Sequence, residues 1–131
     1  MLGSRFFKRF PAIQSYKGLS GGGLASGVEL TLSCGSIVMN FMTAAELPAH
    51  LKGFSGFAQQ TIPNSDTLIY TLSRIAGVRS ALGCVIQCSP LQRGLMRSFL
   101  FEFTGGLNGL LFIDDSIFNF DGERLGGLEC P

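Results

Sequence analysis

Residues 28–42 carry the most regular pattern of the chain and constrain the fold more than any other segment. In the run VELTLS, the apolar residues Val28, Leu30 and Leu32 alternate with polar ones, and the run IVMNFM that follows repeats this period. Gly35 lies between the two runs and can take the positive φ that a tight turn needs. Alternation on both sides of a glycine turn predicts a β-hairpin with one buried face.

Three segments beyond this hairpin have the spacing of amphipathic helices. The first is expected over 44–59, where Thr43 and Glu46 have the spacing of a capping box. The second follows the capping loop 63–66 and stops at Gly77, and the third begins at the dipeptide Ser-Pro of residues 89–90. The expected apolar stripes of these last two helices are Leu68, Ile69, Leu72, Ile75 and Ala76, and then Leu91, Leu95, Phe99 and Phe103.

Further strands are expected between and after these helices. The run ALGCVIQC, residues 81–88, is apolar almost throughout, which is typical of a central strand covered on both faces. Two more strands are predicted in the runs LNGLLFID, residues 107–114, and IFNF, residues 117–120. A turn at Asp114-Asp115-Ser116 joins them, and a turn at Asp121-Gly122 follows. The order of elements predicts an α+β or α/β fold, a two-layer sandwich with a mixed, mainly antiparallel sheet and about three helices packed on it.

The glycine-rich stretch SYKGLSGGGLASG, residues 15–27, resembles a phosphate-binding loop only in composition. Its lysine precedes the glycines, and a strand rather than a helix follows them, so no helix N-terminus is available to a phosphate. We therefore interpret residues 1–27 as an N-terminal arm and a Gly/Ser-rich connector, and residues 28–131 as a single α/β domain. Phe6, Phe7 and Phe10 of the arm are expected to pack on that domain.

The balance of apolar and charged residues indicates an interaction surface. Hydrophobic residues make up 46% of the 131 and charged residues only 15%, below the quarter that is usual in soluble domains. A homo-oligomer, or a neighbouring domain of a longer protein, would cover the excess apolar surface. We therefore expect a non-enzymatic protein-interaction or self-association module.

Several other classes of function are disfavoured. A net charge of +1 argues against nucleic acid as a partner, and the lack of a long apolar run argues against a membrane. Cys84 and Cys88 are too far apart on one strand for a disulfide, and the cysteines and the lone His50 lack metal-ligand spacing. We expect no metal and no cofactor, and a reducing, cytoplasmic location.

The alternative function is a small anionic-ligand-binding or catalytic domain that uses an arginine cluster. Its candidate ligand-binding residues are Arg74, Arg79, Arg93 and Arg97, which lie in a stretch, 67–101, that contains no acidic residue. Arg93 and Arg97 are four residues apart and share one face of the third helix. No catalytic residues are assigned, because His50 has no evident nucleophile beside it and Asp114 and Asp115 have the chemistry of a turn.

Overall fold

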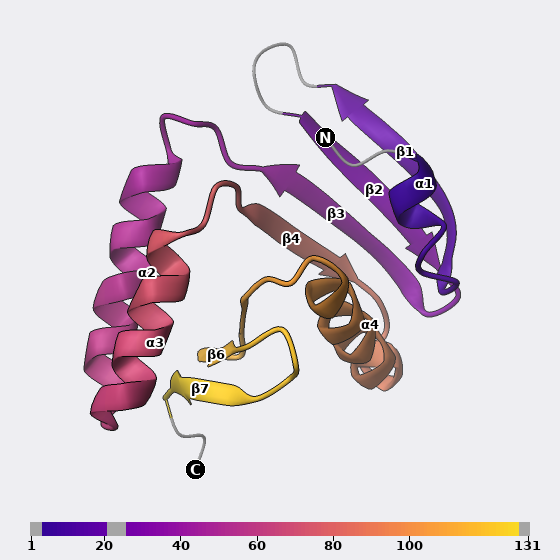
Figure 1. The fold of residues 1–131 in the computed structure, drawn as a ribbon. Helices are drawn as coiled ribbons and strands as arrows, with labels where there is room; N and C mark the ends of the chain where they lie inside the picture. The colour runs from indigo at the N-terminus through magenta and orange to yellow at the C-terminus, as the bar shows by residue number, and fades with distance from the viewer. Residues whose placement is uncertain (1–3, 21–25, 129–131) are drawn as a thin grey trace. The chain divides into compact units, whose positions relative to one another are not determined.

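The structure is a computed structural model that describes residues 4–20 and 26–128 (Figure 1). The chain forms two compact units, unit 1 with Met1–Thr43 and Ala81–Phe99 and unit 2 with Ala44–Ser80 and Leu100–Pro131. Each unit contains an antiparallel sheet, one of four strands and one of three. The predicted α+β fold with mainly antiparallel strands and about three helices is confirmed, but the strands of the described residues form two antiparallel sheets rather than one mixed sheet.

Unit 1 contains the four-stranded sheet in the order β1-β2-β3-β4, as Figure 1 shows. Its elements are α1 (Ser4–Phe7), β1 (Ile13–Ser20), β2 (Ser26–Leu32), β3 (Gly35–Phe41), β4 (Leu82–Gln87), the 3-10 helix η1 (Pro90–Gln92) and the first half of α4 (Arg93–Gly106). The predicted hairpin is confirmed as β2–β3, in which Leu32 pairs with Gly35 at the turn. Gly35 has a φ of 147°, a conformation that favours glycine.

The alternating residues of β2 and β3 form the core of unit 1. Val28, Leu30, Leu32, Ile37 and Met39 are all buried. Phe7 and Phe10 of the N-terminal arm are buried as well, and the ring of Phe10 lies 6.2 Å from that of Phe99 on α4. The expectation that the phenylalanines of the arm pack on the rest of the chain is therefore confirmed for these two residues.

The segment predicted as a connector is a strand over part of its length. Ile13–Ser20 forms β1 and pairs with β2, from Ile13 opposite Leu32 to Ser20 opposite Ser26. The side chains of β1 are mostly exposed, so this edge strand has no clear apolar alternation that would reveal it in the sequence. Residues 21–25 lie outside the described residues, and the division into an arm and one domain stays a prediction.

The prediction that residues 81–88 form a central, doubly covered strand is wrong. The strand exists as β4, but it is the last strand of its sheet, and Val85 and Ile86 are exposed. The third helical stripe is also displaced, because Leu91 and Leu95 are exposed whereas Met96, Phe99 and Phe103 are buried. An apolar run indicates a strand or a helix, but it does not report how many neighbours that element has.

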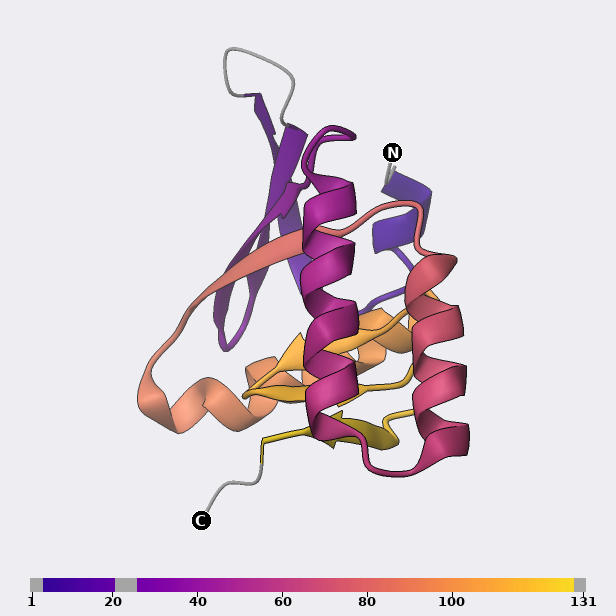
Figure 2. The same cartoon turned by 90° about the vertical axis from the view of Figure 1, so that its left-hand side faces the viewer.

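Unit 2 contains two long helices and the three-stranded sheet. Its elements are α2 (Leu47–Thr61), α3 (Ser65–Ala76), the second half of α4, β5 (Leu111–Ile113), β6 (Ser116–Phe118) and β7 (Arg124–Gly127). α2 and α3 run antiparallel and side by side, as Figure 2 shows. The N-cap of α2 is Glu46 rather than Thr43, with Pro48 in the first turn. The predicted start of α3 is confirmed, since the Asn64 side chain accepts a hydrogen bond of 2.9 Å from the Thr67 N–H.

The core of unit 2 joins the inner faces of α2 and α3 to β6 and β7. Its buried members are Ala58, Ile62, Ile75, Ile117 and Leu125. The predicted turns are confirmed: Asp114 and Asp115 have φ values of 52° and 55° between β5 and β6, and Gly122 has a φ of 87°. Two successive positive φ angles form the tight turn that suits a two-residue hairpin loop.

Candidate functional site

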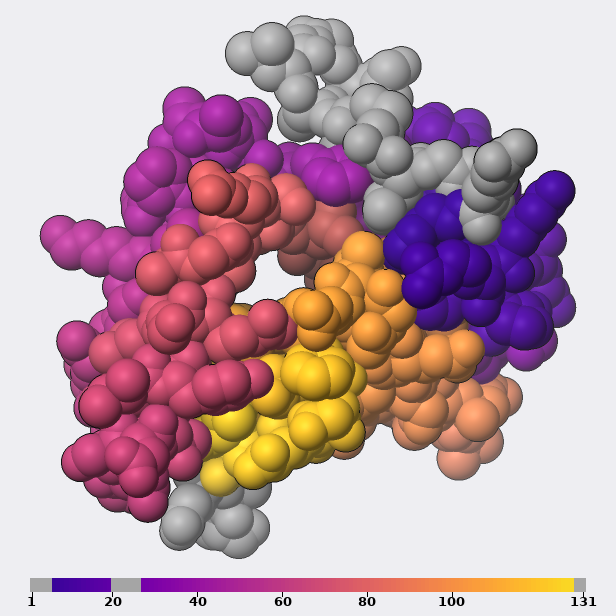
Figure 3. Space-filling model, viewed as in Figure 1, coloured from indigo at the N-terminus to yellow at the C-terminus, as the bar shows by residue number. Residues whose placement is uncertain are grey.

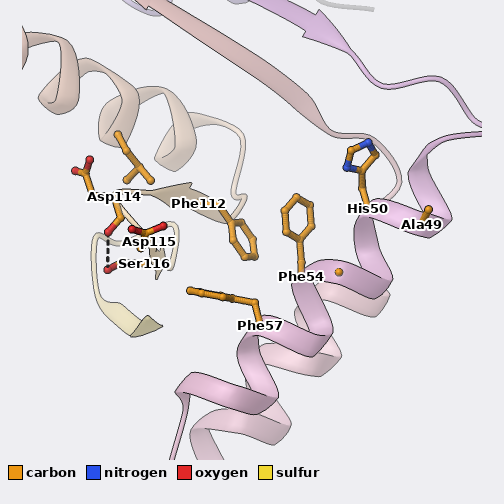
Figure 4. Close-up of a pocket in the computed structure, with 10 residues that line it drawn as sticks. Ala49, His50, Phe54, Phe57, Phe112, Asp114, Asp115 and Ser116 are labelled. Atoms are coloured by element: carbon orange, nitrogen blue, oxygen red, sulfur yellow. Dashed lines mark hydrogen bonds between the residues drawn. The ribbon is translucent and has the colours of Figure 1, made fainter. Parts of the chain in front are cut away.

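A pocket of about 570 Å³ lies between α2 and the turn that joins β5 to β6 (Figure 4). All the residues that line it belong to unit 2. They are Ala49, His50, Gly53, Phe54, Phe57, Phe112, Ile113, Asp114, Asp115 and Ser116. The volume lies in the range of small-molecule sites in proteins.

One face of α2 supplies the first wall of the pocket. Ala49, Gly53 and Phe57 recur every four residues, so they project from the same side of the helix, with His50 and Phe54 beside them. The rings of His50 and Phe54 have centroids 6.4 Å apart. The wall is therefore apolar and mostly aromatic, with an imidazole at the N-terminal end of the helix.

The β5–β6 hairpin supplies the second wall. Phe112 projects from β5, and its ring stacks on that of Phe54 with a centroid distance of 4.2 Å. Asp114 and Asp115 form the turn, and the Asp115 carbonyl accepts a hydrogen bond of 2.8 Å from the N–H of Leu128 beyond β7. This bond and the pairing of Ser116 with Gly127 hold the turn in place.

The polar groups of the pocket do not form a nucleophilic site. Ser116 is buried, and its hydroxyl lies 3.4 Å from the Asp114 carbonyl and accepts a hydrogen bond of 3.3 Å from Arg124 Nε. The hydroxyl is thus engaged with the hairpin itself, and no hydrogen bond to His50 is formed within the described part of the chain. No group of three or more potential metal ligands occurs in residues 4–20 and 26–128.

The four candidate arginines belong to different units. Arg74, in the last turn of α3, and Arg79, in the segment after it, belong to unit 2. Arg93 and Arg97 lie in unit 1, four residues apart on α4, and their side chains are exposed. The convergence of all four on one anion stays a prediction.

Arg74 already has a structural role within unit 2. Its Nη2 donates a hydrogen bond of 2.7 Å to the Asn108 carbonyl, and its guanidinium carbon lies 5.7 Å from the centre of the Phe120 ring. Figure 3 shows the side chains of α3 in direct contact with the C-terminal segment, drawn yellow. Nearby, Asn119 donates a hydrogen bond of 2.8 Å to the Tyr70 hydroxyl. Arg74 thus ties α3 to the loop after α4.

The β4 edge, which we define as Leu82–Gln87, is the largest departure from the sequence prediction. β4 pairs with β3 along one of its edges, and no strand of the described residues pairs with its other edge. Its Val85 is 56% exposed, and Leu91 and Leu95, which follow within the next turn and helix, are 94% and 60% exposed. Exposed apolar side chains beside an unpaired strand are typical of an interaction surface.

Cys84 lies in the β4 edge and is a free thiol, as are Cys34 and Cys88. The residue as a whole is exposed, whereas its thiol group is partly buried. This burial raises the pKa of the Cys84 thiol from 9.0 to about 11. Because the thiolate is the nucleophile, Cys84 is predicted to be an inert thiol near neutral pH.

We expect Cys84 to be alkylated by iodoacetamide at pH 8 about a hundredfold more slowly in the folded protein than in urea, from the change in thiolate fraction. Its rate in the folded protein should still be rising near pH 10, since the pKa is about 11. Mass spectrometry of tryptic peptides after timed quenching would measure both rates. Equal rates in the folded and unfolded chain would contradict the prediction.

No helix of the described residues is long and apolar enough to cross a membrane. No protein-family model, curated protein or solved structure matches the chain.

Proposed function

We propose that the chain is a non-enzymatic self-association module in which the β4 edge pairs with the β4 edge of a second copy. The observation that carries the proposal is the unpaired, apolar edge of the four-stranded sheet. A second strand would satisfy the outward backbone N–H and C=O groups and place its own side chains beside the exposed ones. This arrangement would also account for a surface with few charges.

The two edges of the same sheet differ in a way that supports this choice of surface. β1 contains two features that block strand addition: an irregular register between Ile13 and Ser15, and the exposed Lys17. The β4 edge, with sequence LGCVIQ, has no charge, no proline and no irregular register with β3. Proteins that keep an edge strand free usually protect it, and the absence of such protection at the β4 edge supports the proposal that this edge is paired.

Antiparallel pairing of two β4 edges creates a two-fold symmetric contact. A register centred on Val85 would place this residue opposite its own copy and Cys84 opposite Ile86. The same apolar residues would then be used on both sides, as a two-fold symmetric interface requires. Leu91 and Leu95 would extend the apolar contact beyond the strand itself, toward the roughly 1,000 Å² that a stable interface needs.

The remaining expectations follow from composition. We propose a cytoplasmic location, supported by the free thiols Cys34, Cys84 and Cys88, and we expect neither nucleic acid nor a membrane as partner at a net charge of +1. The alternative, an anion site built on four arginines, is weakened because Arg74 already binds the Asn108 carbonyl.

The solution mass tests the proposal. Size-exclusion chromatography with light scattering, at low and high salt, should give twice the 14.0 kDa of one chain, and the dimer should resist salt because the pairing is apolar. Val85→Lys should convert the dimer to a monomer by placing a charge in the centre of the pairing. Ser15→Lys, which changes another exposed residue on the opposite edge strand, should leave the dimer intact.

Two results would overturn the proposal. One is a wild-type monomer at all accessible concentrations, and the other is a Val85→Lys variant that stays dimeric. Far-ultraviolet circular dichroism of both variants distinguishes a lost interface from a lost fold, because an unchanged spectrum shows that the sheet is intact.

A further inference from the structure

We propose that the pocket between α2 and the β5–β6 turn binds an organic cation, a molecule that carries an ammonium or guanidinium group on an apolar body. This inference concerns unit 2 alone and does not depend on self-association through β4. It combines two properties of the pocket, an aromatic lining and a negatively charged rim.

The aromatic lining would contact the apolar body of the ligand. Phe54, Phe57 and Phe112 line the pocket and are only partly buried, so part of each ring faces it. Phe54 and Phe112 cover one face of each other at 4.2 Å, and Figure 4 shows the Phe57 ring extending toward the hairpin. Covering these rings with a ligand removes apolar surface from water, which favours binding.

The acidic residue in the lining favours a cationic ligand, although Arg124, which is not a lining residue, has its Nε 3.3 Å from the hydroxyl of the lining residue Ser116. The pocket lining includes the acidic residue Asp115 and contains no lysine or arginine, and Figure 4 shows the Asp114 carboxylate pointing away from the phenylalanine rings. Among residues 4–20 and 26–128, no basic side chain forms an ion pair with Asp115. A negative rim attracts a cation and repels an anion, and the faces of the phenylalanine rings also attract a cation.

The position of Asp115 relative to the rings is fixed by the fold. Phe112 lies three residues before Asp115 on the same hairpin, and its stacking on Phe54 ties the hairpin to α2. The hydrogen bond from the Leu128 N–H to the Asp115 carbonyl holds the turn from the other side. The carboxylate and the aromatic wall therefore keep their spacing without a ligand, which lowers the entropic cost of binding.

A charge series on one apolar body tests the inference. Phenethylamine, 2-phenylethanol and phenylacetate have similar shapes and carry a positive, no and a negative charge. Each would be titrated to about 10 mM into ¹⁵N-labelled protein, a concentration that reveals Kd values near 1 mM. We expect phenethylamine to bind about fivefold more tightly than 2-phenylethanol, from one exposed charge pair, and phenylacetate to bind most weakly. The amide signals of Gly53 and Asp115 should shift.

Two matched variants test whether the carboxylate of Asp115 causes the preference for the amine. Asp115→Asn removes the charge but keeps a side chain that tolerates the φ of 55° at this turn position, so the hairpin should persist. It should reduce the affinity for phenethylamine to that for 2-phenylethanol. Glu102→Gln removes an exposed carboxylate that does not line the pocket, and it should leave the order of affinities unchanged.

The inference is overturned if none of the three compounds shifts the signals of pocket residues, or if the amine and the alcohol bind equally. It is also overturned if Asp115→Asn binds phenethylamine as the wild type does. The amide spectrum also shows whether Asp115→Asn is folded. If this variant does not fold, the salt dependence of phenethylamine binding to the wild-type protein is measured instead. Unchanged phenethylamine affinity between low and high salt would then exclude the charge contact.

Discussion

Replacement of Gly127 by alanine is expected to be among the most destabilising single substitutions in unit 2. A Cβ at this position would lie 2.5 Å from Ser116 Cα and 2.7 Å from Ser116 Oγ, and it would also contact the Asp115 carbonyl oxygen. Most of these are backbone atoms, which cannot move without disrupting the β6–β7 ladder. Gly127 also has a φ of 139°, which alanine adopts only with strain. We expect the free energy of unfolding to fall by about 3 kcal/mol or more.

Urea denaturation followed by circular dichroism measures this loss, and Gly56→Ala is the matched control. Gly56 lies inside α2, where a Cβ would meet nothing within 4 Å. Alanine there should raise the free energy of unfolding by about 0.5–1 kcal/mol, because glycine is a poor helix former. If Gly127→Ala is as stable as Gly56→Ala, the close pairing of β7 with the β5–β6 turn is wrong.

Gly35→Ala is expected to have a comparable effect in unit 1. The added Cβ would lie 2.8 Å from Cys88 Cβ and 3.2 Å from Cys88 Cα, and it would collide with the Gln87 carbonyl oxygen at the end of β4. Since φ is 147°, the substitution combines strain with a backbone collision. We expect a loss of about 3 kcal/mol and separation of β4 from β3 at this end.

The readouts for Gly35→Ala are urea denaturation and amide hydrogen exchange of β3. Exchange should accelerate at the end of β3 that pairs with Gln87, and any self-association through the β4 edge should weaken in parallel. Gly18→Ala is the control, because Gly18 is also in a strand but a Cβ there meets nothing within 4 Å. Similar stabilities of the two variants would contradict the close approach of Gly35 to the end of β4.

The sequence predicts those parts of the fold that depend on local chemistry. The hairpin at 28–42 is correct because the alternation of apolar residues and Gly35 specify one register. The start of α3 is correct because the Asn64 cap is a local bond. The turn at Asp114 and Asp115 is correct because aspartate tolerates positive φ.

The errors concern which elements become neighbours. β4 is apolar enough for the centre of a sheet, but no strand of the described residues pairs with its outer edge. β1 was missed because glycine and lysine obscure its pattern and its side chains are mostly exposed. Leu91 and Leu95 fit the helical period of α4 without being buried. Local periodicity does not determine which of several apolar faces finds a partner inside the chain.

The candidate pocket could not be assembled from the sequence. His50, Asp114 and Asp115 stood out individually, but about sixty residues separate the histidine from the turn. The two walls meet through tertiary contacts such as the stacking of Phe112 on Phe54, between β5 and α2. Arg74 was selected for its charge, whereas its actual contacts are the Asn108 carbonyl and the Phe120 ring.

The unequal edges of the four-stranded sheet limit how many copies could join. A sheet that grows without end needs two open edges on every copy, one to receive a strand and one to offer it. In unit 1, Lys17 and the irregular register near Ile13 disfavour the addition of a strand to β1, whereas β4 has no such feature (a closed and an open edge, respectively). Two copies joined through β4 would expose only closed edges, so the assembly would stop at eight strands and could not continue into a fibre.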